Sequence, residues 1–98
     1  MKKLLLIAAL AISTPVFAET KAEQCASYAS LAGVIMDTRQ AGAPMADVMK
    51  VFDTDKAGAE RMRNKVIEAY SAPRMSTEAN KKRMTDDFAN DAYLECIR

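Results

Sequence analysis

The chain has 98 residues, a formal net charge of +1, and neither histidine nor tryptophan. This length allows one domain, and the near-neutral charge excludes the basic surface with which proteins bind nucleic acid or anionic membranes. The absence of histidine removes the commonest general base and the commonest zinc ligand at neutral pH.

The first eighteen residues have the pattern of a secretory signal peptide. Two lysines precede an apolar run from Leu4 to Ile12, and Val16 and Ala18 stand at the −3 and −1 positions of a cleavage site. The run is too short to span a bilayer. We therefore predict cleavage after Ala18, one mature domain over residues 19–98, a periplasmic or secreted location, and no stable membrane insertion after cleavage.

Residues 21–40 are predicted to form the first helix of the mature domain. Thr20 and Glu23 form a capping-box pattern, Arg39 falls in the last turn, and Gly42 suits a helix stop. The apolar residues that recur at helical spacing are Cys25, Tyr28, Ala29, Ala32, Ile35 and Met36.

Two further helices are predicted in the middle of the chain. Pro44 suits the first position of a short helix that ends near Asp53. Asp53 or Thr54 then caps a third helix, which Pro73 ends, although Gly58 is unusual so near a helix start. The expected inward side chains are Met45, Val48, Met49 and Phe52 in the second helix, and Met62, Val66, Ile67 and Tyr70 in the third.

A fourth helix is predicted from a cap at Ser76 to the end of the chain, with Glu78 in its first turn. Its inward stripe is Met84, Phe88, Ala92 and Cys96. No segment alternates as a strand does, so the predicted fold is all-α, a small bundle of about four helices.

The two cysteines, Cys25 and Cys96, allow one intramolecular disulfide, with free thiols or an intermolecular bridge as the alternative. The bridge would place the start of the first helix beside the end of the last, so that these helices pack antiparallel. Closing so long a loop contributes about 4 kcal/mol in the chain-entropy model.

No group of residues predicts catalysis, a cofactor or a metal site. The segment from Asp53 to Gly58 looks like the start of an EF-hand loop, but Ala57 and Asn64 stand where liganding side chains are required. Asp87, Asp91 and Glu95 share a helix face, which is expected to be exposed and to lack the apolar pocket that raises a carboxyl pKa. We therefore expect that the protein is not an enzyme.

Four residues near the helix junctions are candidates for binding a partner: Arg39, Gln40, Tyr70 and Arg74. Arginine and tyrosine at such positions often anchor a partner, but they also tie loops to helix ends. The methionines raise a similar choice, since they fill cores and also line adaptable binding grooves.

The mature chain resembles a group of small exported, disulfide-linked helical proteins of proteobacteria and their phages. The resemblance rests on Cys25, Ile35-Met36-x-x-Arg39-Gln40-x-Gly42, Ala69-Tyr70-x-x-Pro73-Arg74, and Phe88-x-Asn90-Asp91-Ala92-Tyr93-x-x-Cys96. It implies a disulfide and a bacterial or phage origin, and it brings no catalytic or binding residues. In format alone, the chain is also similar to the acid-stress chaperones of enteric bacteria.

These observations favour a non-catalytic interaction protein of the cell envelope, which binds or modulates an envelope protein as a monomer or a small homo-oligomer. One alternative is a periplasmic acid-stress chaperone, because protonation of the carboxylates would leave a strongly positive chain. The other is a carrier of a small apolar ligand between the helices.

Overall fold

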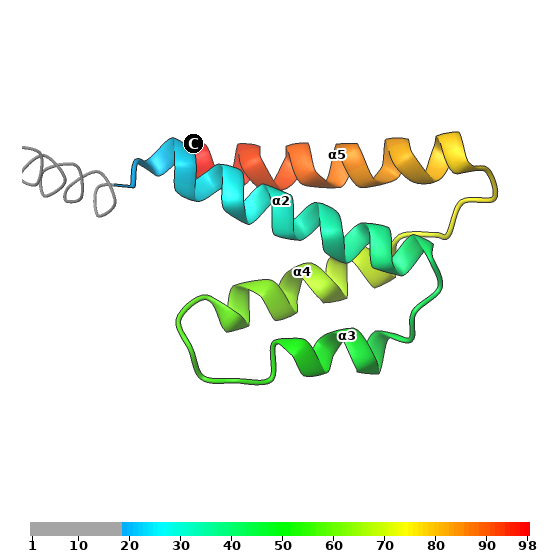
Figure 1. Cartoon of the computed structure of the whole chain (residues 1–98), viewed down its shortest axis with the longest axis horizontal. Coiled ribbons are helices and arrows are strands. Elements are labelled where there is room, and N and C mark those ends of the chain that lie inside the picture. Colours follow the sequence, from blue (N-terminus) through cyan, green and yellow to red (C-terminus); the bar gives the residue numbers. More distant parts are fainter. Residues whose placement is uncertain (1–18) are drawn as a thin grey trace, which may run out of the picture.

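A computed structural model describes residues 19–98, which form four α-helices and no strand (Figure 1). The helices are α2 (Lys21–Gln40), α3 (Met45–Val51), α4 (Ala59–Ser71) and α5 (Glu78–Ile97). The prediction of an all-α bundle of about four helices is confirmed. The predicted signal peptide, residues 1–18, lies outside the described residues.

The two long helices form an antiparallel pair, α2 and α5, which pack more closely than any other two (Figure 1). A disulfide joins Cys25 at the start of α2 to Cys96 at the end of α5, with their Cα atoms 5.5 Å apart. The predicted pairing and the antiparallel arrangement are therefore confirmed. A Cβ atom on Gly33 would lie 3.4 Å from the Cβ of Ala89, an ordinary van der Waals contact, so α5 packs directly against α2 at this glycine.

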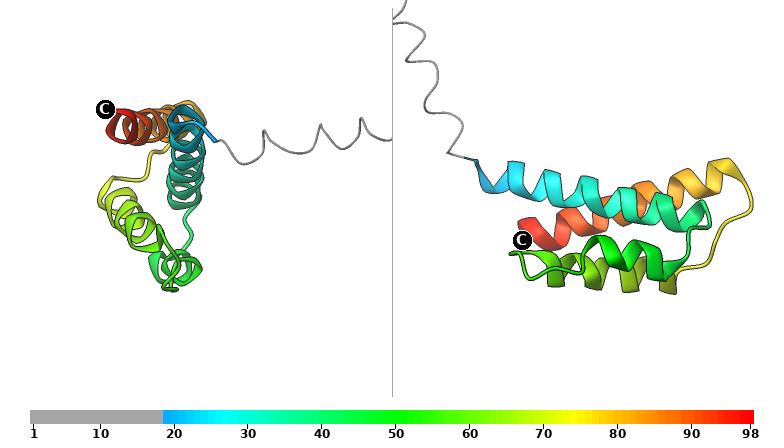
Figure 2. Two further views of the ribbon diagram at one scale, coloured as in Figure 1. Left: turned by 90° about the vertical axis from the view of Figure 1, so that its left-hand side faces the viewer. Right: turned by 60° about the horizontal axis from the view of Figure 1, so that its bottom comes forward.

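The two shorter helices, α3 and α4, pack against α2 and against each other. Viewed end on, they lie to one side of the α2/α5 pair (Figure 2). The core lies where they meet α2, and Met84 and Phe88 of α5 pack against it. Its buried members are Ile35, Met36, Val48, Met62, Val66 and Ala69. Burial of these side chains is the main attraction that holds α3 and α4 to the pair.

Local signals set the boundaries of α2 as predicted. The Thr20 hydroxyl accepts a hydrogen bond from the amide of Glu23 at 3.0 Å, and the Glu23 carboxylate accepts one from the amide of Thr20 at 2.9 Å. At the other end Gly42 adopts a φ of +94°, a conformation that other residues avoid and that turns the chain out of the helix. The short second helix is also present, one residue inside its predicted start, with Pro44 as its N-cap.

The predicted starts of the third and fourth helices are wrong. Residues 53–58 form a loop, and α4 begins only at Ala59, because Gly58 has a φ of +88° that cannot continue a right-handed helix. The Arg63 guanidinium holds this loop by donating to the carbonyl oxygens of Phe52 and Thr54 at 2.6 and 3.1 Å. In α5 the cap is Thr77 rather than Ser76, and its hydroxyl accepts from the amide of Asn80 at 3.1 Å.

Two residues that were predicted to face inward are exposed. Ile67 is 48% exposed and Met45 is 37% exposed. The side of α4 that meets α2 carries Met62, Val66 and Ala69. Ile67 lies about 100° around the helix from Val66, so it points to solvent when Val66 is buried.

Candidate functional site

The structure brings the four predicted partner-binding residues together at one end of the bundle. Arg39 donates from Nε and Nη2 to the carbonyl oxygen of Ala72 at 3.2 and 2.9 Å, and its guanidinium lies over the ring of Tyr70. The Tyr70 hydroxyl donates to the carbonyl oxygen of Ala43 at 2.6 Å. These contacts tie the end of α4 to the end of α2.

Gln40 lies at the centre of this junction and is buried, with only 1% of the residue exposed. Its Nε2 donates to the carbonyl oxygen of Pro73 at 3.0 Å, and its Oε1 accepts from the amide of Met75 at 2.7 Å. Arg74, which is exposed, donates from its guanidinium to the backbone carbonyl of Gln40 at 3.3 Å. The junction residues thus fix the connection between α4 and α5 onto the end of α2, and Arg74 remains accessible from outside.

A second cluster links α2, α4 and α5 through Lys65, which is 3% exposed. Its ammonium donates to Glu68 at 2.8 Å and to Glu95 at 2.7 Å. Glu95 also accepts from the Tyr28 hydroxyl at 3.0 Å, and the Arg61 guanidinium lies 4.0 Å from the centre of the Tyr28 ring. We call Lys65, Glu68, Glu95, Tyr28 and Arg61 the clasp.

The clasp keeps its two main partners charged. Burial alone would raise the pKa of Glu95, but hydrogen bonds from Lys65 and Tyr28 outweigh it and lower that pKa below its ordinary value. Burial would lower the pKa of Lys65, but hydrogen bonds to Glu68 and Glu95 raise it. Burial and the bond to Glu95 raise the pKa of Tyr28. A carboxylate and an ammonium held in this way suit a structural link better than proton transfer near neutral pH.

Sequence reasoning missed Lys65 and placed Glu95 on a purely solvated face. The available signal was position, because Lys65 lies three residues after Met62 and four before Ala69, on the side of α4 that is buried. Asp87 and Asp91, the other members of the predicted acidic face, are exposed. Within residues 19–98, no three histidine, cysteine, aspartate or glutamate side chains gather closely enough to hold a metal ion.

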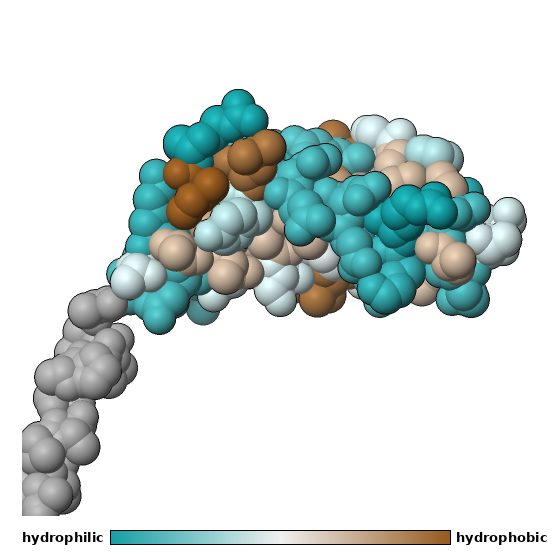
Figure 3. Space-filling model, turned by 90° about the horizontal axis from the view of Figure 1, so that it is seen from above, coloured by the Kyte–Doolittle hydropathy of each residue, from teal (hydrophilic) through white to brown (hydrophobic). Residues whose placement is uncertain are grey.

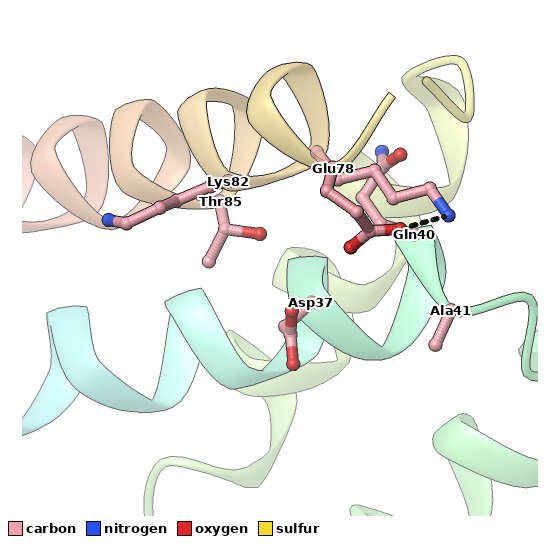
Figure 4. Close-up of a pocket in the computed structure, with 7 residues that line it drawn as sticks. Asp37, Gln40, Ala41, Glu78, Lys82 and Thr85 are labelled. Atoms are coloured by element: carbon pink, nitrogen blue, oxygen red, sulfur yellow. Dashed lines mark hydrogen bonds and ion pairs between the residues drawn. The ribbon is translucent and has the colours of Figure 1, made fainter. Parts of the chain in front are cut away.

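A polar cleft of about 290 Å³ lies between the second half of α2 and the first half of α5 (Figure 4). The charged side chains that α5 contributes form ion pairs along that helix, where Lys81 contacts Glu78 at 3.4 Å and Lys82 contacts Asp86 at 2.7 Å, whereas Asp37 of α2 makes no ion pair within residues 19–98. Thr85 contributes a buried hydroxyl without a hydrogen-bond partner in the described part of the chain. Ordinary helix-surface ion pairs account for the charges that α5 contributes to this cleft.

An apolar groove of about 300 Å³ runs between α2 and α3. Leu31 and Val34 on α2 are 38% and 57% exposed, and Val51 on α3 is 70% exposed. The full lining is Leu31, Val34, Ile35, Thr38, Ala43, Asp47, Val48, Val51 and Phe52. No methionine lines this groove. Of the two predicted roles for the methionines, Met36 and Met62 have that of core residues, because both are buried in the core cluster.

One feature of the sequence indicates this groove, although the overall composition does not show it. From Gln24 to Met36, α2 has no charged residue on any side. Charged residues normally occupy the solvent side of a surface helix, so an uncharged stretch predicts that this side is covered, yet Leu31 and Val34 within it are exposed. Figure 3 shows the molecule from above the view of Figure 1, and this side is mostly hydrophilic, with apolar colour in small separate areas.

Comparison with protein-family models, curated proteins and solved structures finds no match for this chain. None of the helices in the described range is both long enough and apolar enough to cross a membrane.

Proposed function

We propose that this chain is an exported, non-catalytic protein of the bacterial envelope that binds a partner protein in the groove between α2 and α3. The observation that carries the proposal is the exposed apolar lining of that groove, formed in part by the uncharged stretch of α2 from Gln24 to Met36. Contiguous exposed apolar surface on a small domain marks an interaction site more often than chance packing. The disulfide supports export, since such bonds persist in oxidising compartments.

The junction offers a second contact surface. Arg39, Gln40 and Tyr70 use their polar groups to hold the fold, so their substitution is expected to disturb the domain as well as any partner. Arg74 is exposed and binds only a backbone carbonyl of the described chain, so it is the junction residue that best tests partner binding.

The test is capture from an envelope extract by immobilised, oxidised protein, with bound proteins identified by mass spectrometry. Val51→Lys places a charge in the groove without disturbing the core, because Val51 is 70% exposed. Ile67→Lys and Leu94→Lys are matched controls, since these residues are 48% and 49% exposed and do not line the groove. We expect one stoichiometric partner that Val51→Lys loses and the two controls retain.

Other outcomes would redirect the assignment. A partner lost only with Arg74→Ala would move the contact to the junction. A partner retained by every variant would overturn the groove as the site. A small apolar molecule that remains bound in native mass spectra, and that Val51→Lys releases, would favour the carrier alternative.

The clasp favours a second candidate function, that of an acid-stress chaperone. When the pH falls through the lowered pKa of Glu95, that carboxylate becomes protonated, and the buried Lys65 ammonium loses its charged partner on α5. Release of α4 from α5 would expose Met62 and Val66 to client proteins. The test is binding of an apolar-surface dye at pH 2 to 3 with the disulfide intact, and a domain that binds no dye there would rule this candidate out.

A further inference from the structure

The groove between α2 and α3 continues into a second hollow of about 340 Å³, and together they form one trough. Leu31 and Phe52 line both hollows and so mark the point where they join. Along α2 the trough extends from Thr38 to Tyr28, which is about 15 Å at the rise of an α-helix. That length accommodates about three turns of a bound helix.

The two ends of the trough carry opposite charges. Asp47 lies at one end, near Thr38, whereas Lys56 and Arg61 lie at the other, near Tyr28. Asp47 and Lys56 are exposed, and their side chains make no ion pair or hydrogen bond within the described residues. The middle of the trough is apolar, with Leu31, Val34, Val48, Val51 and Phe52.

A helix suits this trough better than an extended peptide. Helices α2 and α3 form the walls of the first hollow, the loop before α4 forms much of the second, and residues 19–98 contain no strand edge to which a peptide could add. An extended peptide would therefore leave its backbone amides and carbonyls without partners over apolar side chains, whereas a helix satisfies them internally. A second copy of the chain fits less well, because its large exposed apolar residues outside the trough, Met45, Ile67 and Leu94, lie one on each of three helices and form no single apolar helix face.

We propose that the trough binds an amphipathic helix of the partner protein, with the acidic end of that helix at Lys56 and Arg61 and its basic end at Asp47. This inference rests on the proposed function, whose partner it describes. Helices generally carry acidic residues in the first turn and basic residues in the last. A helix of this common kind would lie parallel to α2, from the end near Tyr28 to the end near Thr38.

The test uses two synthetic helical peptides that share one leucine stripe. The first has two glutamates in its first turn and two lysines in its last turn, and the second has these charges exchanged. Their dissociation constants are measured by fluorescence anisotropy for the wild-type protein and for the Asp47→Lys/Lys56→Asp variant. Both substituted side chains are exposed, so the variant is expected to fold, which circular dichroism checks.

We expect the first peptide to bind the wild-type protein about tenfold more tightly than the second, and this preference to disappear or invert in the variant. Any difference in helicity between the peptides is the same for both proteins, so it cancels in the comparison. Raising the salt concentration should reduce the preference, since the charges are exposed. Val51→Lys should abolish binding of both peptides, and Ile67→Lys should not.

Each failure has a distinct meaning. If both proteins show the same preference, the charge polarity is wrong, while capture of a partner that Val51→Lys loses would leave the proposed function standing. If neither peptide binds, a helix is not the occupant. Self-association of the wild-type protein in sedimentation that Val51→Lys removes would assign the trough to a second copy and overturn the proposal.

Discussion

The α2/α5 pair and the α3/α4 pair are held in different ways. The first consists of two long helices that pack closely past Gly33 and are joined covalently by Cys25 and Cys96. The second is attached through the core around Met36 and Val66, through the junction at Gln40, and through the clasp at Lys65. One part of the domain is thus cross-linked, and the other depends on side-chain contacts.

This difference predicts where the domain opens first. Segments with few buried contacts and accessible hydrogen bonds open at lower free energy than the most densely packed elements. We expect α3 and α4 to separate from α2 while α2 and α5 remain joined. The trough lies along the boundary between these two parts, so a bound partner would stabilise that boundary.

The largest expected effect comes from removing the covalent link between α2 and α5. Cys25→Ser/Cys96→Ser should lower the free energy of unfolding by about 4 kcal/mol, because the cysteines are 71 residues apart and the bridge restricts the unfolded chain. Urea unfolding monitored by circular dichroism measures this loss. A change below about 1 kcal/mol would show that the α2/α5 pair holds by packing alone.

The next effect comes from the junction. Gln40→Leu should lower the free energy of unfolding by about 3 kcal/mol, because it leaves the carbonyl of Pro73 and the amide of Met75 without their partner. Gln24→Leu is the matched control, since it makes the same change at an exposed position of α2 and should shift stability by about 0.5 kcal/mol or less. Equal effects of the two substitutions would contradict the structural role of Gln40.

The clasp should make the attachment of α4 depend on pH. Glu95 has a lowered pKa in the folded state, so its stabilisation is present above its ordinary value of 4.5 and is lost as the pH falls through the folded value. Lys65 has a raised pKa, so its contribution is present below its ordinary value of 10.5 and is lost as the pH rises toward the folded value. Stability should therefore be highest between these limits.

Glu95→Gln tests the clasp directly. At pH 7 we expect a loss of about 2 kcal/mol, less than for a fully buried ion pair because the Glu95 side chain is 47% exposed. Glu68→Gln is the control, since it contacts the same lysine but lies on the same helix and links nothing to α5. Urea unfolding from pH 7 to pH 3 should show a smaller acid loss for Glu95→Gln than for the wild type, and an unchanged acid loss would contradict the clasp.

The sequence predicted those parts of the fold that depend on local chemistry. The capping box at Thr20, the stop at Gly42 and the single possible disulfide are local or combinatorial signals, and they gave the bounds of α2 and its pairing with α5. The start of α4 was missed because the acidic residues before it resemble a cap, whereas a long-range bond from Arg63 and a left-handed Gly58 hold that segment as a loop.

The candidate sites were predicted less well, because they depend on which side of each helix is covered. The four junction residues were identified by their place near helix ends, but the distances that make Gln40 a structural residue come from tertiary packing. Helical spacing aligned Lys65 with Met62 and Ala69, but packing against α2 decides which side of α4 is buried and therefore leaves Ile67 outside. The groove could be predicted only by combining the uncharged stretch of α2 with the knowledge that part of this stretch is exposed, which comes from tertiary packing.

The smallest expected effect is a difference between two glycines that share a conformation. Gly42 and Gly58 have φ values of +94° and +88°, so alanine at either position should cost about 1 kcal/mol or more in backbone strain. A Cβ atom at Gly58 meets nothing within 4 Å, whereas one at Gly42 would lie 3.1 Å from Nη2 of Arg74. The Arg74 side chain would then move away and lose its bonds to the carbonyl of Gln40.

We therefore expect Gly42→Ala to destabilise the domain by about 1 kcal/mol more than Gly58→Ala, the net value of one hydrogen bond. Thermal unfolding of both variants, with and without Arg74→Ala, separates strain from the lost contact. In the Arg74→Ala background the two glycine substitutions should become equal, because no guanidinium remains to be displaced. If Gly42→Ala still destabilised the domain more than Gly58→Ala in the Arg74→Ala background, the turn itself would require Gly42. The contact between Arg74 and the carbonyl of Gln40 would then add little to stability, and Arg74 could bind a partner without weakening the junction.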